Sequence, residues 1–144
     1  EPAYFKHVSE AATHLMEASG TTAKDYKWAV FHQPNTKFPQ RVASQLGFSM
    51  DSIEPGLLVP VIGNTYAGAA MIGLTATLDI AQPGDRILCV SFGSGAGSDA
   101  FDITVTDAAP LRAGLAMKTQ DYVKRRSEID YATYVRYRGK LQMK

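Results

Sequence analysis

Lys27-Trp28-Ala29-Val30-Phe31-His32-Gln33-Pro34, residues 27–34, is the stretch of sequence that decides the fold. Its apolar run, Trp28 to Phe31, consists of strand-forming residues and is bounded by charge on one side and by Pro34 on the other. The run therefore predicts a buried strand. His32 follows it directly, so we expect this side chain where a parallel strand leaves its sheet, the usual place for sites in α/β proteins.

Outward from this strand, the apolar spacing predicts alternating helices and strands. Apolar residues recur every three or four positions from Tyr4 to Ser19, and again at Phe38, Val42 and Leu46, which indicates amphipathic helices before and after the strand. Further elements are expected as a strand over 57–62, a buried helix rich in small residues over 66–81, and strands over 87–92 and 101–105. After the first helix the expected order is strand, helix, strand, helix, strand, strand. This order predicts a layered α/β/α fold with a mixed, mostly parallel sheet closed by a hairpin.

A chain of 144 residues fits one domain. We expect residues 1–117 to form it, with 1–20 as a leading helix, and residues 118–144 to be a basic, tyrosine-rich tail that is helical and docked. The sequence begins with Glu1-Pro2, without methionine or the layout of a signal peptide. The expectation is an internal start, as in a processed, split or truncated product.

The composition of the chain excludes several classes of function. The 15 basic and 14 acidic residues give a formal charge of +1, which offers no global electrostatic reason to expect nucleic acid or membrane as a partner. A single cysteine excludes an internal disulfide framework and a multi-cysteine zinc site, and it fits a reducing cytoplasm. No stretch approaches the ~20 apolar residues that a membrane span needs.

Two polar residues at expected strand ends are candidates for chemistry. His32 could be catalytic, although a histidine at such a place is more often a structural hydrogen-bonding residue. Asn64 lies between an expected strand and the apolar helix, where its amide could cap the helix or point into a cavity. His7 and His14 on the first helix lack a third ligand, so no metal site is expected.

The glycine-rich segment from Phe92 to Gly97 and its surroundings give weaker signals. A dinucleotide loop is rejected because an expected strand, not a helix, follows the glycines. Two interpretations of the segment remain open: a plain hairpin, or a turn that exposes a backbone amide to a developing negative charge. Cys89 fits a core position and is not assigned as a nucleophile. Lys37 and Arg41, four residues apart, could bind a phosphate or belong to a solvated helix face.

Three separated segments share their order and spacing with one family. The segments are His32 to Lys37, Gly63 to Gly68 and Ser91 to Gly95. They resemble the C-terminal half of thiolase-fold condensing enzymes, and most of all the hydroxymethylglutaryl-CoA synthase family of the archaeal type. The tyrosine-rich basic tail is also similar to that type. The His-x-Pro-x-Thr-Lys run and the Gly-Ser-Gly loop are less like the ketoacyl synthase III relatives.

The resemblance implies a condensation of acetyl-CoA with acetoacetyl-CoA in the mevalonate route to isoprenoids, with CoA thioesters as substrates and no further cofactor. It implies that His32 polarises the carbonyl of acetoacetyl-CoA, that Asn64 helps to hold it, and that the Ser94 amide stabilises the thioester oxyanion. Five further residues are implied to bind substrate or CoA: Lys37, Arg41, Tyr66, Gly93 and Gly95.

The resemblance also implies what this chain lacks. The family's nucleophilic cysteine and its glutamate acid/base belong to an N-terminal half, which we expect as a partner in the same or a separate chain. Ser91 stands where degradative thiolases have a second cysteine, so that class is disfavoured. The whole enzyme is expected to be a cytoplasmic homodimer that associates with an acetoacetyl-CoA thiolase and a zinc-ribbon/OB-fold scaffold protein. A ketoacyl synthase III-like enzyme and a non-catalytic acyl-CoA-binding or scaffold subunit remain alternatives.

Overall fold

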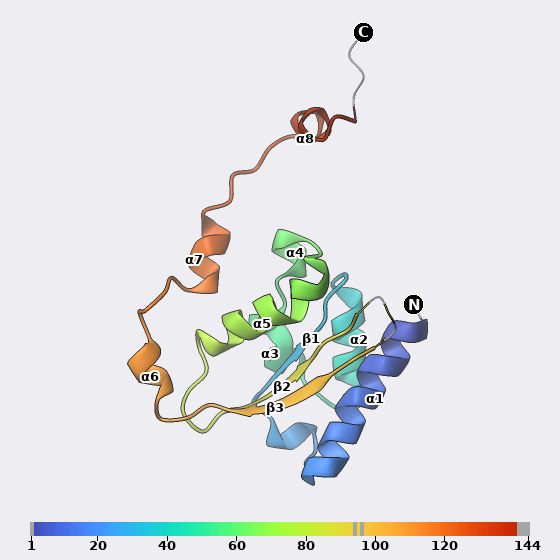
Figure 1. Cartoon of the computed structure of the whole chain (residues 1–144), viewed down its shortest axis with the longest axis vertical. Helices are drawn as coiled ribbons and strands as arrows, with labels where there is room; N and C mark the ends of the chain where they lie inside the picture. Colours follow the sequence, from blue (N-terminus) through green and yellow to red (C-terminus); the bar gives the residue numbers. More distant parts are fainter. Residues whose placement is uncertain (1, 94, 96, 141–144) are drawn as a thin grey trace.

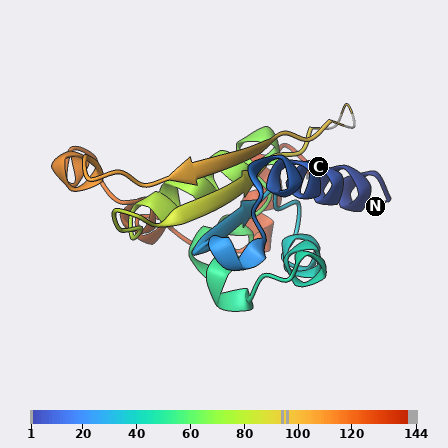
Figure 2. The same cartoon turned by 90° about the horizontal axis from the view of Figure 1, so that it is seen from below.

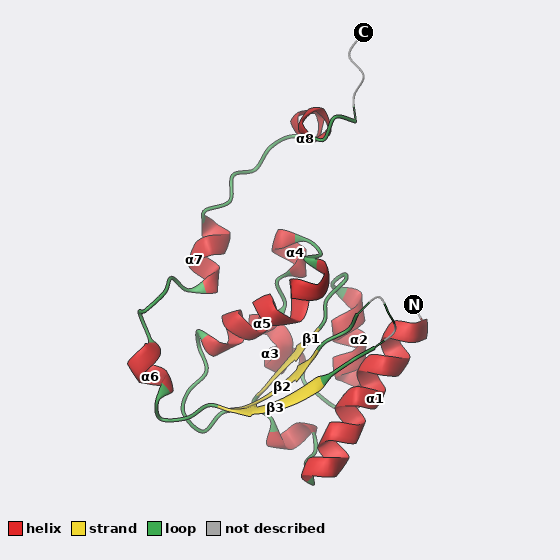
Figure 3. Ribbon diagram, in the orientation of Figure 1, coloured by secondary structure: helices red, strands yellow, loops and turns green. Residues whose placement is uncertain are grey.

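The core of the protein is a three-stranded mixed sheet. The structure is a computed structural model that describes residues 2–93, 95 and 97–140. The strands β1 (Trp28–Phe31), β2 (Arg86–Val90) and β3 (Ala100–Thr104) lie in that order (Figures 1 and 3). β1 pairs with β2 in parallel, and β2 pairs with β3 antiparallel. The strand predicted before His32 and the closing hairpin are therefore confirmed.

Helices cover both faces of the sheet, which confirms the predicted α/β/α layers. α1 (Pro2–Ser19) and α2 (Lys37–Leu46) lie on one face and α5 (Ala69–Leu78) on the other (Figure 2). Side chains alternate along β2, so that Leu88 and Val90 enter the α1 and α2 side of the core, while Ile87 and Cys89 enter the α5 side.

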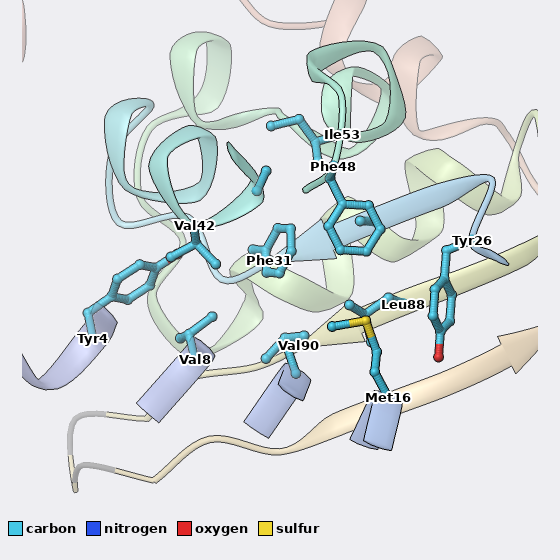
Figure 4. Close-up of a cluster of buried hydrophobic side chains, with 13 residues drawn as sticks. Tyr4, Val8, Met16, Tyr26, Phe31, Val42, Phe48, Ile53, Leu88 and Val90 are labelled. Atoms are coloured by element: carbon cyan, nitrogen blue, oxygen red, sulfur yellow. The ribbon is translucent and has the colours of Figure 1, made fainter. Parts of the chain in front are cut away.

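The larger core cluster lies between the sheet and the two helices α1 and α2. In Figure 4, Val8 and Met16 of α1 approach Leu88 and Val90 of β2, and Val42 of α2 closes the cluster beside Phe31. Val8 is fully buried. Such a side chain contributes about 1.5–3 kcal/mol when it is removed from water. The helix ends follow the sequence, because Gly20 and Gly47 take positive φ angles of 63° and 89°.

The strand predicted over 57–62 is wrong. In its place, after the 3-10 helix η2 (Glu54–Gly56), the chain forms a single helical turn, α4 (Val59–Ile62). Pro60 lacks a backbone N–H and suits the first turn of a helix better than a strand ladder. The N–H groups of Leu58 and Val59 instead donate to the side-chain oxygen of Gln33, at 2.7 and 2.8 Å. A buried side chain thus replaces the strand partner that the apolar pattern implied.

The helix predicted over 66–81 begins as a 3-10 turn, η3 (Tyr66–Gly68), and continues as α5, which ends at Leu78. α5 approaches η2 so closely that only glycine fits on both sides of the contact. A Cβ atom on Gly73 would lie 2.8 Å from the carbonyl oxygen of Gly56, and one on Gly56 would lie 3.2 Å from the carbonyl oxygen of Gly73. The small residues noted in the sequence therefore serve backbone-to-backbone packing.

The remaining elements are short. Before and after α2 lie the 3-10 helix η1 (Ala23–Asp25) and α3 (Met50–Ile53), and after β3 come α6 (Ala109–Arg112), α7 (Thr119–Lys124) and α8 (Tyr131–Tyr137). α7 contacts α5, where the Thr119 N–H donates to Asp79 Oδ2 at 2.6 Å. α8 lies beyond α7, away from the sheet (Figure 1). Among the described helices, none has the length and apolar character to cross a membrane.

We predict that Gly73→Ala lowers the free energy of unfolding by about 1–3 kcal/mol, because the added methyl group would overpack three neighbours. These are the Gly56 carbonyl oxygen, Val30 Cγ1 at 2.9 Å and Gln33 Nε2 at 3.0 Å. Urea denaturation followed by the fluorescence of Trp28, the single tryptophan, measures the change. Gly68→Ala is the matched control, since a Cβ there meets nothing within 4 Å. Equal effects of the two substitutions would contradict the packing explanation.

Candidate active site

His32 lies at the carboxyl end of β1 and is held by its backbone on two sides. Its N–H donates to the carbonyl oxygen of Val90 at 2.8 Å, which extends the parallel ladder by one bond. Its carbonyl oxygen accepts a bond of 2.6 Å from the hydroxyl of Tyr4 on α1. Because both partners are buried core residues, the backbone of His32 is fixed by the sheet and by α1.

The imidazole of His32 is 7% exposed and lies beside the rings of Tyr4 and Phe92, whose centroids are 6.2 and 5.8 Å away. This burial lowers the pKa of His32, because the charged imidazolium loses its hydration. Nδ1 is buried and has no hydrogen-bond partner among the described residues. A buried ring nitrogen normally has one, which makes Nδ1 of His32 a candidate contact for a substrate.

A cavity of about 440 Å³ lies next to Phe92. Five of the residues that line it are Ala67, Phe92, Gly93, Gly95 and Asp99. The cavity thus joins the glycine-rich loop after β2 to the segment that follows Asn64. Since His32 contacts Phe92, three segments that are far apart in the sequence meet at the carboxyl end of β1 and β2 (Figure 1).

The glycine-rich loop is a hairpin turn between β2 and β3. The Gly93 N–H donates to the Gly97 carbonyl oxygen at 2.9 Å, and the Ser91 N–H donates to the Asp99 carbonyl oxygen at the same distance. Gly93 and Gly95 line the cavity. Ser94, whose amide we predicted to stabilise an oxyanion, lies outside the described residues.

Asn64 and Tyr66 lie in the exposed loop between α4 and α5. Asn64 Oδ1 accepts a bond of 2.8 Å from the Tyr66 N–H, so the side-chain oxygen shapes the turn and the NH₂ group is the part that could donate to a substrate. Tyr66 has a positive φ of 52°, and its side chain is 78% exposed. A non-glycine residue with this conformation costs of order 1–3 kcal/mol and is typical of functional loops.

The structure brings together only part of the predicted set. Lys37 and Arg41 lie on the exposed side of α2, and the Arg41 guanidinium lies 4.7 Å from the centre of the Phe5 ring. Of the predicted residues that are described, Gly93 and Gly95 line the cavity directly, and His32 contacts its lining residue Phe92. Asn64 and Tyr66 lie in the same loop as the lining residue Ala67. The roles assigned to all of these residues stay predictions.

Two residues that shape the site were missed by the sequence reasoning. Gln33 is 3% exposed and bonds to the backbone around α4, and Tyr4 anchors the backbone of His32. Gln33 has no periodic signal. Tyr4 lies four residues before Val8 on the buried face of α1, but the apolar spacing pointed to Phe5, which is only partly buried. The position of Gln33 directly after the candidate histidine, within the His-x-Pro-x-Thr-Lys run, was the available hint.

Cys89 does not complete the site as a nucleophile. It is buried in β2 on the α5 side of the sheet. Burial raises the pKa of its thiol to about 11, so the reactive thiolate is scarce at neutral pH. Among the described residues, no three histidine, cysteine or acidic side chains are grouped so that they could hold a metal ion.

Residues 16–103 match the model of the 3-oxoacyl-[acyl-carrier-protein] synthase III C-terminal family. The chain is 56% identical over 141 residues to the hydroxymethylglutaryl-CoA synthase of Methanocella arvoryzae and 59% identical over 143 residues to that of Thermococcus onnurineus. These matches cover 98% and 99% of the chain, which spans 41% of the length of each relative.

Among solved structures, the chain is similar to PksG, an HMG-CoA synthase from Bacillus subtilis. The TM-score is 0.76 at 18% identity, and the match covers 95% of this chain and 39% of that one. At this identity the likeness concerns the fold, and it confirms the predicted thiolase-like architecture. The resemblance to condensing enzymes that the three sequence segments indicated is confirmed by the family match.

We predict that the pKa of His32 lies below the ordinary histidine value of 6.5, because burial removes hydration from the charged imidazolium. As pH falls below 6.5, the unfolded chain binds a proton that the folded chain refuses, so this residue then lowers the stability of the fold. An NMR titration of the imidazole signals measures the pKa, with His32→Gln identifying the signal. A midpoint at or above 6.5 would contradict the prediction.

Proposed function

The chain belongs to the 3-oxoacyl-[acyl-carrier-protein] synthase III C-terminal family, and from this premise we propose that it is the C-terminal part of a hydroxymethylglutaryl-CoA synthase. Identities of 56–59% over nearly the whole chain to proteins of that name support the proposal. The reaction is the condensation of acetyl-CoA with acetoacetyl-CoA, in the mevalonate route. CoA thioesters are the substrates, and the chemistry needs no other cofactor.

The observation that carries the proposal is a buried imidazole, with a pKa lowered by its burial, beside a cavity where two loops meet. In the reaction, an acetyl group is held on a cysteine as a thioester. Loss of a proton from its methyl carbon gives an enolate that adds to the ketone of acetoacetyl-CoA, and water then releases the product and the free thiol. The ketone oxygen gains negative charge as the carbon-carbon bond forms. A donor fixed in a water-poor site stabilises that charge more in the transition state than in the ground state.

We assign the donor role to His32 and the holding of the same substrate to Asn64. A neutral imidazole can donate one hydrogen bond, and its fixed backbone means that little reorganisation is needed when charge develops. The Asn64 NH₂ group is a second neutral donor. The Ser94 amide, with Gly93 and Gly95, is proposed to face the thioester oxygen, and Tyr66, Lys37 and Arg41 to lie toward the CoA moiety.

The reaction needs a nucleophilic cysteine and an acid/base, and the only cysteine of the chain is buried with a raised pKa. We propose that an N-terminal portion supplies both. The surface of α5 supports this partner. Met71 and Leu78 form an exposed stripe with partly exposed Leu74, and Phe101 of β3 is exposed on the same side of the sheet. A helix that is apolar all round normally lies inside a larger core.

We predict that Met71→Lys weakens association of the chain with the N-terminal portion at least tenfold, since a charge would be buried in an apolar contact. Co-purification or calorimetry of the two portions, expressed as separate chains, measures this. Met50→Lys is the matched control, because Met50 is also exposed (43% against 61%) but lies on α3 and not on α5. Equal binding by the two variants would remove α5 as the contact face.

We predict that His32→Ala, in the complete enzyme, lowers the rate of condensation with acetoacetyl-CoA by about 10²–10³-fold, as expected for loss of one oxyanion donor. Acetylation of the nucleophile should continue, because the proposed donor acts on the second substrate. Radiolabelled acetyl-CoA separates the two steps, and His14→Ala on the exposed side of α1 is the control. An unchanged condensation rate would refute the role of His32.

A ketoacyl synthase III-like function is the second candidate, and the name of the matched family favours it. The two functions differ in the second substrate, since the alternative enzyme would elongate an acyl group on an acyl carrier protein. Rates with acetoacetyl-CoA and with a malonylated carrier protein distinguish them. We further propose a cytoplasmic homodimer that associates with an acetoacetyl-CoA thiolase and a zinc-ribbon/OB-fold scaffold protein. A purely scaffolding role would leave the His32 variant without effect.

A further inference from the structure

The side chain of Gln33 uses all of its hydrogen-bonding capacity inside the protein. Nε2 donates to the carbonyl oxygens of Gly56, at 2.7 Å, and Ala69, at 3.3 Å. Oε1 accepts from the N–H groups of Leu58 and Val59, at 2.7 and 2.8 Å. A carboxamide has two donor hydrogens and two acceptor positions, so none is left over. The group is 3% exposed, which makes each of these bonds costly to lose.

The four partners lie on both sides of one loop. Leu58 and Val59 precede the segment 60–68, and Ala69 follows it. That segment contains Asn64 and Ala67, which are respectively a candidate substrate donor and part of the cavity wall. Gln33 itself is the residue next to His32. One side chain therefore ties the backbone that carries the candidate imidazole to both stems of the loop that carries the candidate amide.

The surroundings of Gln33 leave it little freedom to shift. A Cβ on Gly73 would lie 3.0 Å from Nε2, so the carboxamide fits against bare backbone of α5. The Tyr4 hydroxyl fixes the preceding carbonyl of His32 from the other side of the sheet. Two donors that must act on the same substrate oxygen or its neighbour need this kind of support, because a displacement of 1 Å can reduce a rate by about 10²-fold.

We propose that Gln33 is a positioning residue for the condensation step: its carboxamide sets the distance and orientation between His32 and the Asn64 loop. The inference rests on the proposed synthase function and deepens it. Gln33 touches no reacting atom. Its effect passes through the four backbone groups that it binds, and it belongs to the step in which the second substrate is held and not to acetylation of the nucleophile.

The test uses Gln33→Met in the complete enzyme, because methionine has nearly the same volume and makes none of the four bonds. We expect the kcat of condensation to fall about 10- to 100-fold, with acetylation by radiolabelled acetyl-CoA within about twofold of the wild-type rate. A loss of equal size in both steps would mean a general structural defect and would overturn the proposal. Wild-type rates in both steps would also overturn the proposal.

Gln33→Glu is the conservative variant and gives a second measurement if Gln33→Met fails to fold. Its two oxygens keep the shape of the carboxamide, and a protonated carboxyl can donate to Gly56 while it accepts from Leu58 and Val59. As pH rises and the carboxyl ionises, it faces two carbonyl oxygens without a proton to share. We expect the condensation rate relative to wild type to fall with rising pH. A ratio that does not change with pH would count against positioning by Gln33.

Failure of the proposed function can be told apart from failure of this inference. If the wild-type enzyme does not condense acetoacetyl-CoA, the synthase proposal fails. Hydrogen-deuterium exchange of Gln33→Met then tests the positioning role by itself. Faster exchange over 57–69 with unchanged exchange over 28–31 would support a clamp on the Asn64 loop, and unchanged exchange in both segments would overturn it.

Discussion

The close contact of α5 with the backbone of η2, sealed by the Gln33 carboxamide, is the constraint on which the rest of the structure depends. Two glycines, Gly56 and Gly73, let main chain meet main chain, and the carboxamide satisfies the polar groups that this contact would otherwise bury without partners. A buried polar group without a hydrogen-bond partner destabilises the fold, so the close contact of α5 with η2 depends on the Gln33 side chain. With this contact and these bonds in place, the chain passes from η2 to α5 through the helical turn α4, without a strand.

The same constraint builds the candidate site. β1 and β2 end at the same edge of the sheet because they are parallel, and this edge receives His32 and the glycine-rich loop. The Asn64 loop reaches that edge only because its two stems are fixed beside β1. The backbone therefore fixes the layout of the site, and the side chains with candidate roles extend from this backbone. The apolar stripe of α5 faces away from this core and fits a fold that continues in another segment.

Much of the fold was predictable from the sequence, for local reasons. Apolar spacing located α1 and α2, and the glycines at 20 and 47 marked their ends. The uninterrupted run at β1 and the alternation at β3 indicated strands, and the glycines between β2 and β3 indicated a hairpin. The three motifs at 32–37, 63–68 and 91–95 indicated the family, because their order and spacing are specific even where each motif alone is weak.

What the sequence indicated by itself was most of the helices and strands, the family and the candidate site residues, since these depend on spacing and side-chain type. Tertiary structure decided the rest. An apolar, β-branched segment at 57–62 became a helical turn because Gln33, 25 residues before Leu58, took the bonds that a strand would have used. The pKa of His32 is lowered because α1 and Phe92 exclude water from the imidazole. Both outcomes depend on long-range contacts, which local spacing does not encode.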